Sequence, residues 1–202
     1  MDNLIEGYRR FRADIWPAER ARYERLARRG QSPEALVVAC SDSRVDPQTV
    51  FGAVPGELFV VRNVAGLVPP YSPDAQYHGT SAALEFGVRV LKVSDIIVLG
   101  HALCGGVQAM VEGAPVDARD FVEPWVRIAQ DVPRPPPGMV DPVEILTHYE
   151  VEVVRLSLAN LLTFPWIAEA VAAGRLGLYG FRFDIHTGVL SRLEQHGFAP
   201  VT

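Results

Sequence analysis

Residues 35–44 read ALVVACSDSR, an apolar run that stops at a cysteine and passes into a polar segment. Such a run is typical of a strand buried on both faces of a parallel sheet. Residues 58–63, LFVVRN, and residues 95–106, DIIVLGHALCGG, have the same form. We therefore expect buried strands over 35–39, 58–61 and 95–99, with their polar ends at one edge of the sheet.

Helical patterns alternate with these strands. We expect helices over 79–91, from about 107, and over 142–162. The first places Ala82, Ala83, Phe86 and Val90 on one face. The third has an acid, Asp141, at its N-cap and proline at its first position.

The remaining segments complete the expected chain order. Residues 133–138 are rich in proline and predict a loop. Another helix begins at Pro165, for which Thr163 is the candidate cap, and segments 176–184 and 189–193 alternate as in a hairpin. Together these patterns predict a single α/β domain over residues 1–202, with a mostly parallel central β-sheet flanked by helices on both faces.

The first 30 residues predict an N-terminal helical arm. Leu4, Tyr8, Phe11 and Ile15 follow the spacing of one apolar helix face, and Pro17 begins a second helical piece. Eight arginines against five acids make this arm locally basic. Two interpretations stay open, namely a solvated helix with one apolar face and an arm that wraps around a second copy of the chain.

The composition disfavours several classes of partner. Hydrophobic residues make up 49% of the 202 residues and charged residues 21%, with a net charge of −5, as in ordinary globular domains. An acidic balance does not favour nucleic acid or an anionic membrane. The charged start lacks the signal-peptide pattern, and no apolar run approaches the about 20 residues that cross a bilayer. We therefore expect a cytoplasmic protein with neither kind of partner.

Three candidate metal ligands follow the first and third expected strands: Cys40, His101 and Cys104. In a reducing compartment, free, catalytic or metal-bound thiolates are favoured over a disulfide. Two sulfurs and one imidazole suit zinc, and three protein ligands leave the open position of a catalytic site. Gly105 and Gly106 begin a helix there, which favours a thiolate at Cys104. The His-x-x-Cys pattern alone also fits ordinary packing.

A carboxylate and an arginine lie directly after the first candidate ligand. Asp42 and Arg44 are costly to place at a buried strand end unless they are paired. We therefore expect an ion pair, either structural or catalytic.

The longer motifs around these residues are similar to those of a known family. CSDSR at 40–44 and HALCGG at 101–106 resemble the β-class carbonic anhydrases. PGELFVVRN at 55–63, GTSAALE at 79–85 and SLANLLT at 157–163 extend the resemblance, which covers roughly residues 30–190. It implies a carbonate dehydratase in which Cys40, His101 and Cys104 bind one Zn²⁺ per chain.

The resemblance also implies a mechanism. Arg44 holds Asp42 with two hydrogen bonds, and Asp42 accepts a proton from zinc-bound water. Zinc lowers the pKa of that water towards about 7. The zinc-bound hydroxide then attacks carbon dioxide, which gives bicarbonate and a proton.

The resemblance points to the plant-type, open-site subgroup. Val37 stands three residues before Cys40, where the bicarbonate-regulated enzymes carry tryptophan, and Gln31-Ser32-Pro33 precedes the strand as in plant-type enzymes. This implies that Asp42 stays off the metal and that the Gln31 amide can donate to the substrate.

The same alignment implies a substrate pocket. Phe59, Val64 and Phe86 align with its apolar lining, and the Gly105 amide can donate to the substrate. Phe86 departs from the usual plant-type tyrosine. Without the resemblance, these apolar residues would be interpreted as ordinary core, and Gln31 as an exposed loop residue.

The resemblance further implies a homodimer, or a multiple of dimers, with the site at the subunit interface. The partner would contribute Gln31, Phe59 and Phe86. Two other functions stay open at this stage. One is hydrolysis of carbonyl sulfide or carbon disulfide at the same site, which Phe86 keeps possible. The other is a non-catalytic zinc-binding scaffold, against which the Asp42 and Arg44 pair argues.

Overall fold

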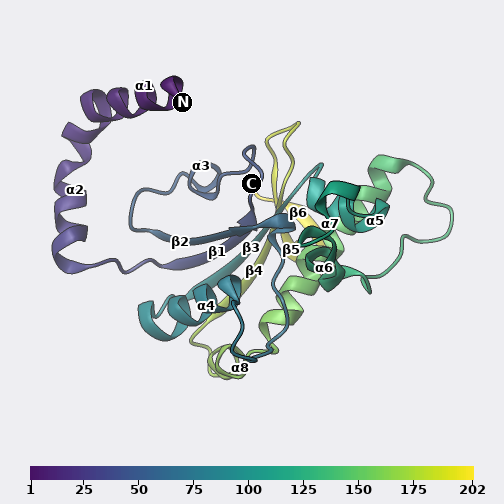
Figure 1. Cartoon of the computed structure of the whole chain (residues 1–202). Helices are drawn as coiled ribbons and strands as arrows, with labels where there is room; N and C mark the ends of the chain where they lie inside the picture. Colours follow the sequence, from purple (N-terminus) through teal and green to yellow (C-terminus); the bar gives the residue numbers. More distant parts are fainter.

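A six-stranded sheet forms the centre of the protein, in the order β2-β1-β3-β4-β5-β6 (Figure 1). The computed structural model describes all residues, 1–202. Strands β2, β1, β3 and β4 are parallel, and β5 and β6 continue the sheet antiparallel. The predicted mostly parallel sheet is therefore confirmed. The strands are β1 Ala35–Cys40, β2 Leu58–Asn63, β3 Asp95–His101, β4 Gly177–Phe183, β5 Leu190–Glu194 and β6 Gly197–Pro200.

Strand β1 runs through the core, and every one of its residues is buried. Successive strand residues point to opposite faces of a sheet. Leu36 and Val38 accordingly belong to one buried cluster, whereas Val37 and Ala39 belong to another. The near-continuous apolar run of the sequence thus serves two cores, one on each side of the sheet.

Helices cover both sides of the sheet. In Figure 1, α3 lies above the sheet, and α4 and α8 lie below it. The α-helices of this body are α3 Pro47–Phe51, α4 Gly79–Glu85, α5 Gly105–Glu112, α6 Val122–Val126, α7 Pro142–Leu161 and α8 Pro165–Ala172. Short turns of other helix types complete it: η2 Val64–Gly66, η3 Phe86–Leu91, η4 Val116–Ala118 and η5 Arg127–Ala129.

Helix α7 packs unusually close to the sheet. A Cβ atom at Gly100 would lie 2.6 Å from Cγ2 of Val154, and one at Gly180 would lie 2.9 Å from Cγ1 of the same valine. Glycine on β3 and β4 therefore makes room for the helix. The predicted start of α7 is confirmed, since the Asp141 carboxylate accepts hydrogen bonds from the first-turn amides.

One local prediction differs from the structure, and the direction of one predicted helix face becomes visible. The N-cap of α8 is Phe164 rather than Thr163, because the Thr163 hydroxyl donates to the Asn160 carbonyl instead, 2.6 Å away. The apolar face expected over 79–91 exists but points away from the core. Phe86 is 45% exposed and Val90 60% exposed, so this stripe is a surface feature of the single chain.

The N-terminal arm consists of α1 Asp2–Arg10, η1 Phe11–Ile15 and α2 Trp16–Arg29. It stands apart from the body of the molecule (Figure 1), and none of its residues is buried. Its outer part keeps Leu4, Tyr8 and Ile15 more than half exposed. At its inner end, the Leu26 side chain lies against Gly56 of the body.

No single helix combines the length and the apolar character that a membrane span requires. Helices α7 and α8 meet the length and composition criteria only as a pair, and that pair is bent by 90° at the break between them.

Candidate active site

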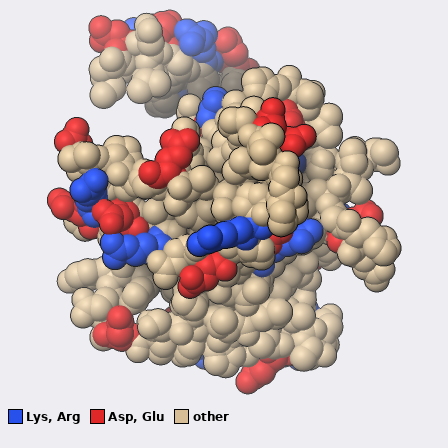
Figure 2. Space-filling view, turned by 90° about the vertical axis from the view of Figure 1, so that its right-hand side faces the viewer, with Lys and Arg blue, Asp and Glu red and all other residues tan.

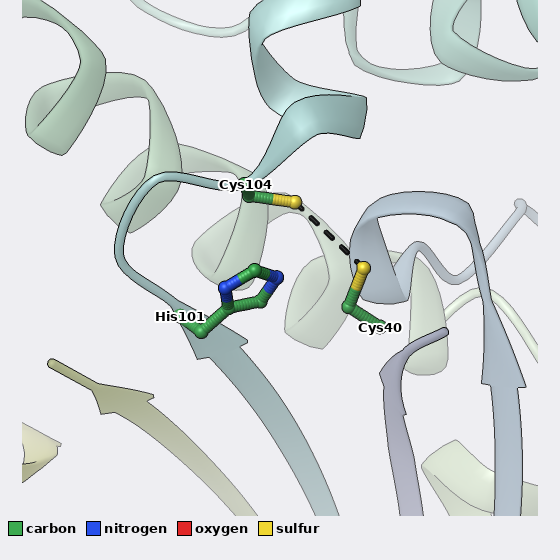
Figure 3. A group of neighbouring side chains, drawn as sticks. All are labelled: Cys40, His101 and Cys104. Carbon is green, nitrogen blue, oxygen red and sulfur yellow. Dashed lines mark hydrogen bonds between the residues drawn. The ribbon is translucent and has the colours of Figure 1, made fainter. Parts of the chain in front are cut away.

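Three side chains with metal-binding atoms converge at the carboxyl ends of two adjacent strands. Cys40 ends β1, His101 ends β3, and Cys104 immediately precedes α5. Figure 3 shows the three side chains pointing towards a common space. Their ligand atoms all lie within 4.8 Å of one another, and all three residues are buried. The sequence prediction that these residues meet is confirmed.

His101 presents one nitrogen to this space. Its Nδ1 donates a hydrogen bond to the Ala102 carbonyl, 2.9 Å away, which leaves Nε2 as the free nitrogen. That Nε2 is buried and has no hydrogen-bond partner. An orphaned buried nitrogen is costly, and a metal ion would satisfy it.

The two sulfurs lie 3.8 Å apart. The hydrogen bond from Cys104 lowers the pKa of the Cys40 thiol, whereas the same bond raises the pKa of Cys104. With a proton on Cys104, Cys40 is the sulfur that ionises more readily. Because thiolates are the metal-binding form, binding of a cation would displace that proton.

An aspartate held by an arginine lies beside the cluster. Oδ1 of Asp42 accepts from Nε of Arg44 at 2.9 Å, and Oδ2 accepts from Nη2 at 2.7 Å. The Arg44 hydrogen bonds hold the pKa of Asp42 below its usual range. Oδ2 also lies 4.0 Å from Nε2 of His101, so this oxygen faces the space between the three ligands.

Two arginines fix the loops that carry these groups. Nη2 of Arg44 also donates to the Leu103 carbonyl at 3.1 Å, which ties the loop after β1 to the loop after β3. From β2, Arg62 donates to the carbonyl oxygens of Cys40 and Asp42 at 2.9 and 2.6 Å. The positions of Cys40 and Asp42 are therefore set by backbone contacts as well as by the strand.

A buried ion pair, which the sequence did not reveal, supports the third ligand. Glu150 on α7 is 2% exposed. Its Oε1 accepts from the Cys104 amide at 3.3 Å, and its Oε2 accepts from Arg182 of β4 at 2.7 Å. The only signal in the sequence was a charged residue at a helix position that turns out to be buried. The sequence alone does not show which face of α7 is buried.

The residues expected to bind substrate divide into two groups. Gly105 follows Cys104, and Val64 packs against the glycine after it, with Cγ1 2.7 Å from the position of a Cβ at Gly106. Both therefore lie at the cluster.

The second group lies elsewhere on the chain. Phe59 pairs in register with Leu36, four residues before Cys40, which is about 13 Å along a strand. Phe86 contacts Phe59, with ring centroids 5.8 Å apart. Gln31 is exposed between α2 and β1. Within one chain, the structure does not bring these three residues to the cluster.

Comparisons with known proteins identify the family of the chain. The chain matches the carbonic anhydrase family model over residues 35–190. It is 38% identical to a carbonic anhydrase of Pseudomonas aeruginosa over 204 residues, which covers 96% of this chain and 88% of the relative. It is 41% identical over 165 residues to beta carbonic anhydrase 5, chloroplastic, of Arabidopsis thaliana, which covers 78% of this chain and 53% of the relative.

Solved structures show the same likeness. The β-carbonic anhydrase CcaA matches with a TM-score of 0.89 and 30% identity, covering 100% of this chain and 92% of that one. A structure from a study of two tetrameric β-carbonic anhydrases of Sordaria macrospora matches with a TM-score of 0.72 and 27% identity, covering 100% and 95%. With its cysteine and histidine cluster at the strand ends, the chain therefore belongs to the β-class carbonic anhydrases, the carbonate dehydratases.

Proposed function

We propose that the protein catalyses the reversible hydration of carbon dioxide to bicarbonate and a proton, with one zinc ion bound by Cys40, His101 and Cys104. The convergence of two thiols and an unpartnered imidazole nitrogen beside Asp42 carries the proposal. Two sulfurs and one nitrogen are a donor set that zinc accepts. When bound there, zinc supplies Lewis acidity, which lowers the pKa of coordinated water to about 7.

Asp42 and Arg44 orient the nucleophile. Oδ1 of Asp42 already accepts from both the amide and Nε of Arg44, whereas Oδ2 accepts only from Nη2 among protein groups. Oδ2 therefore keeps a lone pair free for a water molecule beside His101. Because its pKa is low, Asp42 stays ionised and acts as an acceptor rather than as a donor.

The substrate pocket is completed by a second copy of the chain. Carbon dioxide has no dipole, so an apolar lining with one or two donors suits it. Val64 and the Gly105 amide come from the chain that holds the ligands, and Gln31, Phe59 and Phe86 from its partner. Their distance from the cluster within one chain, together with the exposure of Phe86, supports this division.

We further propose that the arm holds this homodimer, or a multiple of dimers, together. Its apolar side chains Leu4, Tyr8 and Ile15 are exposed to solvent in the single chain, and an apolar patch of this kind marks an interaction surface. Figure 2 shows the side of the body turned away from the arm, where charged side chains of both signs are interspersed among wide uncharged areas.

The protein is proposed to be of the open-site, plant-type kind. In the regulated style, the aspartate must leave its arginine to reach the metal. Here Arg44 holds Asp42 through three hydrogen bonds, and Val37 is fully buried in the core. A cytoplasmic location is proposed as well, since a reducing compartment keeps the two cysteines available as ligands.

The test is stopped-flow hydration of carbon dioxide near pH 8, on protein whose zinc content has been measured. We expect fast hydration with one zinc per chain. Full zinc content without hydration, at neutral and alkaline pH alike, would contradict the proposal. Carbonyl sulfide would then be the next substrate to test, with the Phe86→Tyr variant beside the natural chain.

A further inference from the structure

The proposed reaction leaves one requirement unmet, namely an exit for the proton. Hydration converts carbon dioxide and water into bicarbonate and one proton, which must leave before the next cycle. Asp42 is a poor carrier because the Arg44 hydrogen bonds favour its ionised form, and His101 is occupied as a ligand. A further titratable group near the site has to receive the proton.

His78 is linked to the ligand cluster through Asn63 and Thr80. Cys40 is the register partner of Asn63 at the end of β2. The Asn63 side chain donates from Nδ2 to the hydroxyl of Thr80 at 3.1 Å. Thr80 lies in the first turn of α4, two residues after His78. The start of α4, with His78 as its N-cap, is thereby fixed beside the carboxyl end of β2, the strand next to β1.

His78 also lies in the wall between two cavities. One cavity, of about 760 Å³, is lined by Asn63, which is the register partner of Cys40, by Val64, and by the aromatic residues Tyr77, Phe121 and Trp125. The second cavity, of about 330 Å³, lies on the other side of the wall. Only His78 and Ser81 line both.

The two cavities differ in their charged lining. Arg62 is the charged residue of the larger cavity, whereas the smaller one contains Asp74, Glu85 and Arg89. Nε2 of His78 lies 2.6 Å from Oδ1 of Asp74. Glu85 is paired with Arg89 at 2.9 Å, which leaves Asp74 as the carboxylate that compensates a charge on His78.

From this placement we infer that His78 carries the product proton from the larger cavity to the smaller one and so to bulk buffer, with Asp74 as its positioning residue. The inference rests on the proposed function. Among the histidines other than His101, only His78 lines the larger cavity. In the single chain its side chain is 38% exposed.

The proton balance of the step is simple. A water chain in the larger cavity delivers one proton to the neutral imidazole of His78, and the imidazolium is paired with the Asp74 carboxylate. A buffer base then removes the proton and restores the neutral ring. No electron moves, and the only co-reactant is the buffer.

The test separates proton export from the interconversion of carbon dioxide and bicarbonate. We expect His78→Asn at low buffer concentration to lower kcat by roughly tenfold to a hundredfold, with kcat/KM within about twofold of the natural chain. Added imidazole should restore kcat. Oxygen-18 exchange should show slower release of labelled water with unchanged interconversion. Asp74→Asn should give a smaller fall in the same parameter.

His196→Asn is the matched control, because His196 lies in the turn between β5 and β6, and it should leave kcat unchanged. Zinc content and Tm are measured for every variant. Equal kcat for His78→Asn and the natural chain at low buffer, or a loss that imidazole does not restore, would overturn the role of His78. Absence of hydration in the zinc-loaded natural chain would instead overturn the proposed function, and this inference with it.

Discussion

At the scale of single residues, Asp42 combines two requirements in one carboxylate. Arg44 occupies Oδ1 and one side of Oδ2, and the remaining side of Oδ2 faces His101. The arginine thus fixes both the ionisation of the group and its orientation. An acceptor that is positioned before the substrate arrives has no reorganisation cost during the reaction.

We predict that Asp42→Asn lowers kcat/KM for hydration by roughly 10²- to 10³-fold, within the range of a lost acid–base interaction. Zinc content should stay at one per chain, because Asp42 is not expected to bind the metal. Stopped-flow assays and metal analysis on the same preparation measure both. Asp117→Asn, at an exposed carboxylate of η4, should change neither, and an unaffected rate in Asp42→Asn would disprove the role of Asp42.

The same pair predicts a pH dependence of stability. Because Arg44 depresses the folded-state pKa of Asp42, the pair stabilises the fold above the unfolded aspartate pKa of about 3.9. This contribution is lost as the pH falls through the folded-state pKa. Arg44→Gln should therefore destabilise the protein more at pH 7 than near pH 3. Urea unfolding of metal-free protein at both pH values measures the difference, and equal destabilisation at the two would contradict it.

At the scale of secondary-structure elements, the buried ion pair between Glu150 of α7 and Arg182 of β4 stabilises the backbone at Cys104. Glu150 is almost fully buried, and its charge is compensated chiefly by Arg182. We predict that Arg182→Ala lowers the free energy of unfolding by about 3–5 kcal/mol, because it leaves a buried carboxylate unpaired.

The control comes from the same helix. Arg155 pairs with Glu152 on α7, but its side chain is 45% exposed, so Arg155→Ala should cost no more than about 1 kcal/mol. Chemical denaturation of the two variants side by side gives the comparison. Equal losses would mean that burial of Glu150 does not decide the effect.

The sequence predicted those elements that are long enough to show an apolar pattern or that begin with a recognisable cap. Long apolar runs identified β1, β2 and β3, and an acid before a proline identified the start of α7. Asp46 before Pro47 is the same signal and begins α3, whose five residues are too few to show helical periodicity. Strand β6 is a four-residue edge strand ending in proline, which is too short for alternation to indicate it.

The candidate site likewise contains residues that the sequence predicted and residues that it did not. The ligands were predictable because each lies at the end of a buried parallel strand, where the topology brings distant segments together. Glu150 was not predictable, since its contact with Cys104 joins residues 46 positions apart through the packing of a helix. The orientation of the stripe containing Phe86 was equally hidden, because periodicity defines a helix face but not what covers it.

At the scale of the whole molecule, the arm is the element whose apolar side chains stay exposed to solvent in a single chain. We predict that Leu4→Glu combined with Ile15→Glu raises the dimer dissociation constant by at least about a hundredfold. Two large apolar side chains would each lose about 1.5 kcal/mol or more of burial. Sedimentation equilibrium across a range of concentrations measures this constant.

Asp14→Lys is the control for charge, because it alters the same arm at an exposed polar position. It should change the dissociation constant far less than the double variant. A dimer unaffected by both would show that the arm does not contribute to association, and the search for the interface would move to the stripe of Phe86 and Val90.

The detached arm also has a consequence for how the protein matures after synthesis. Since no residue of α1, η1 or α2 is buried, both cores can be completed without them. Refolding of the body should then be first order, at a rate independent of protein concentration. Ordering of the arm should follow as a second-order phase, so the active enzyme appears at a rate set by how often two finished bodies meet.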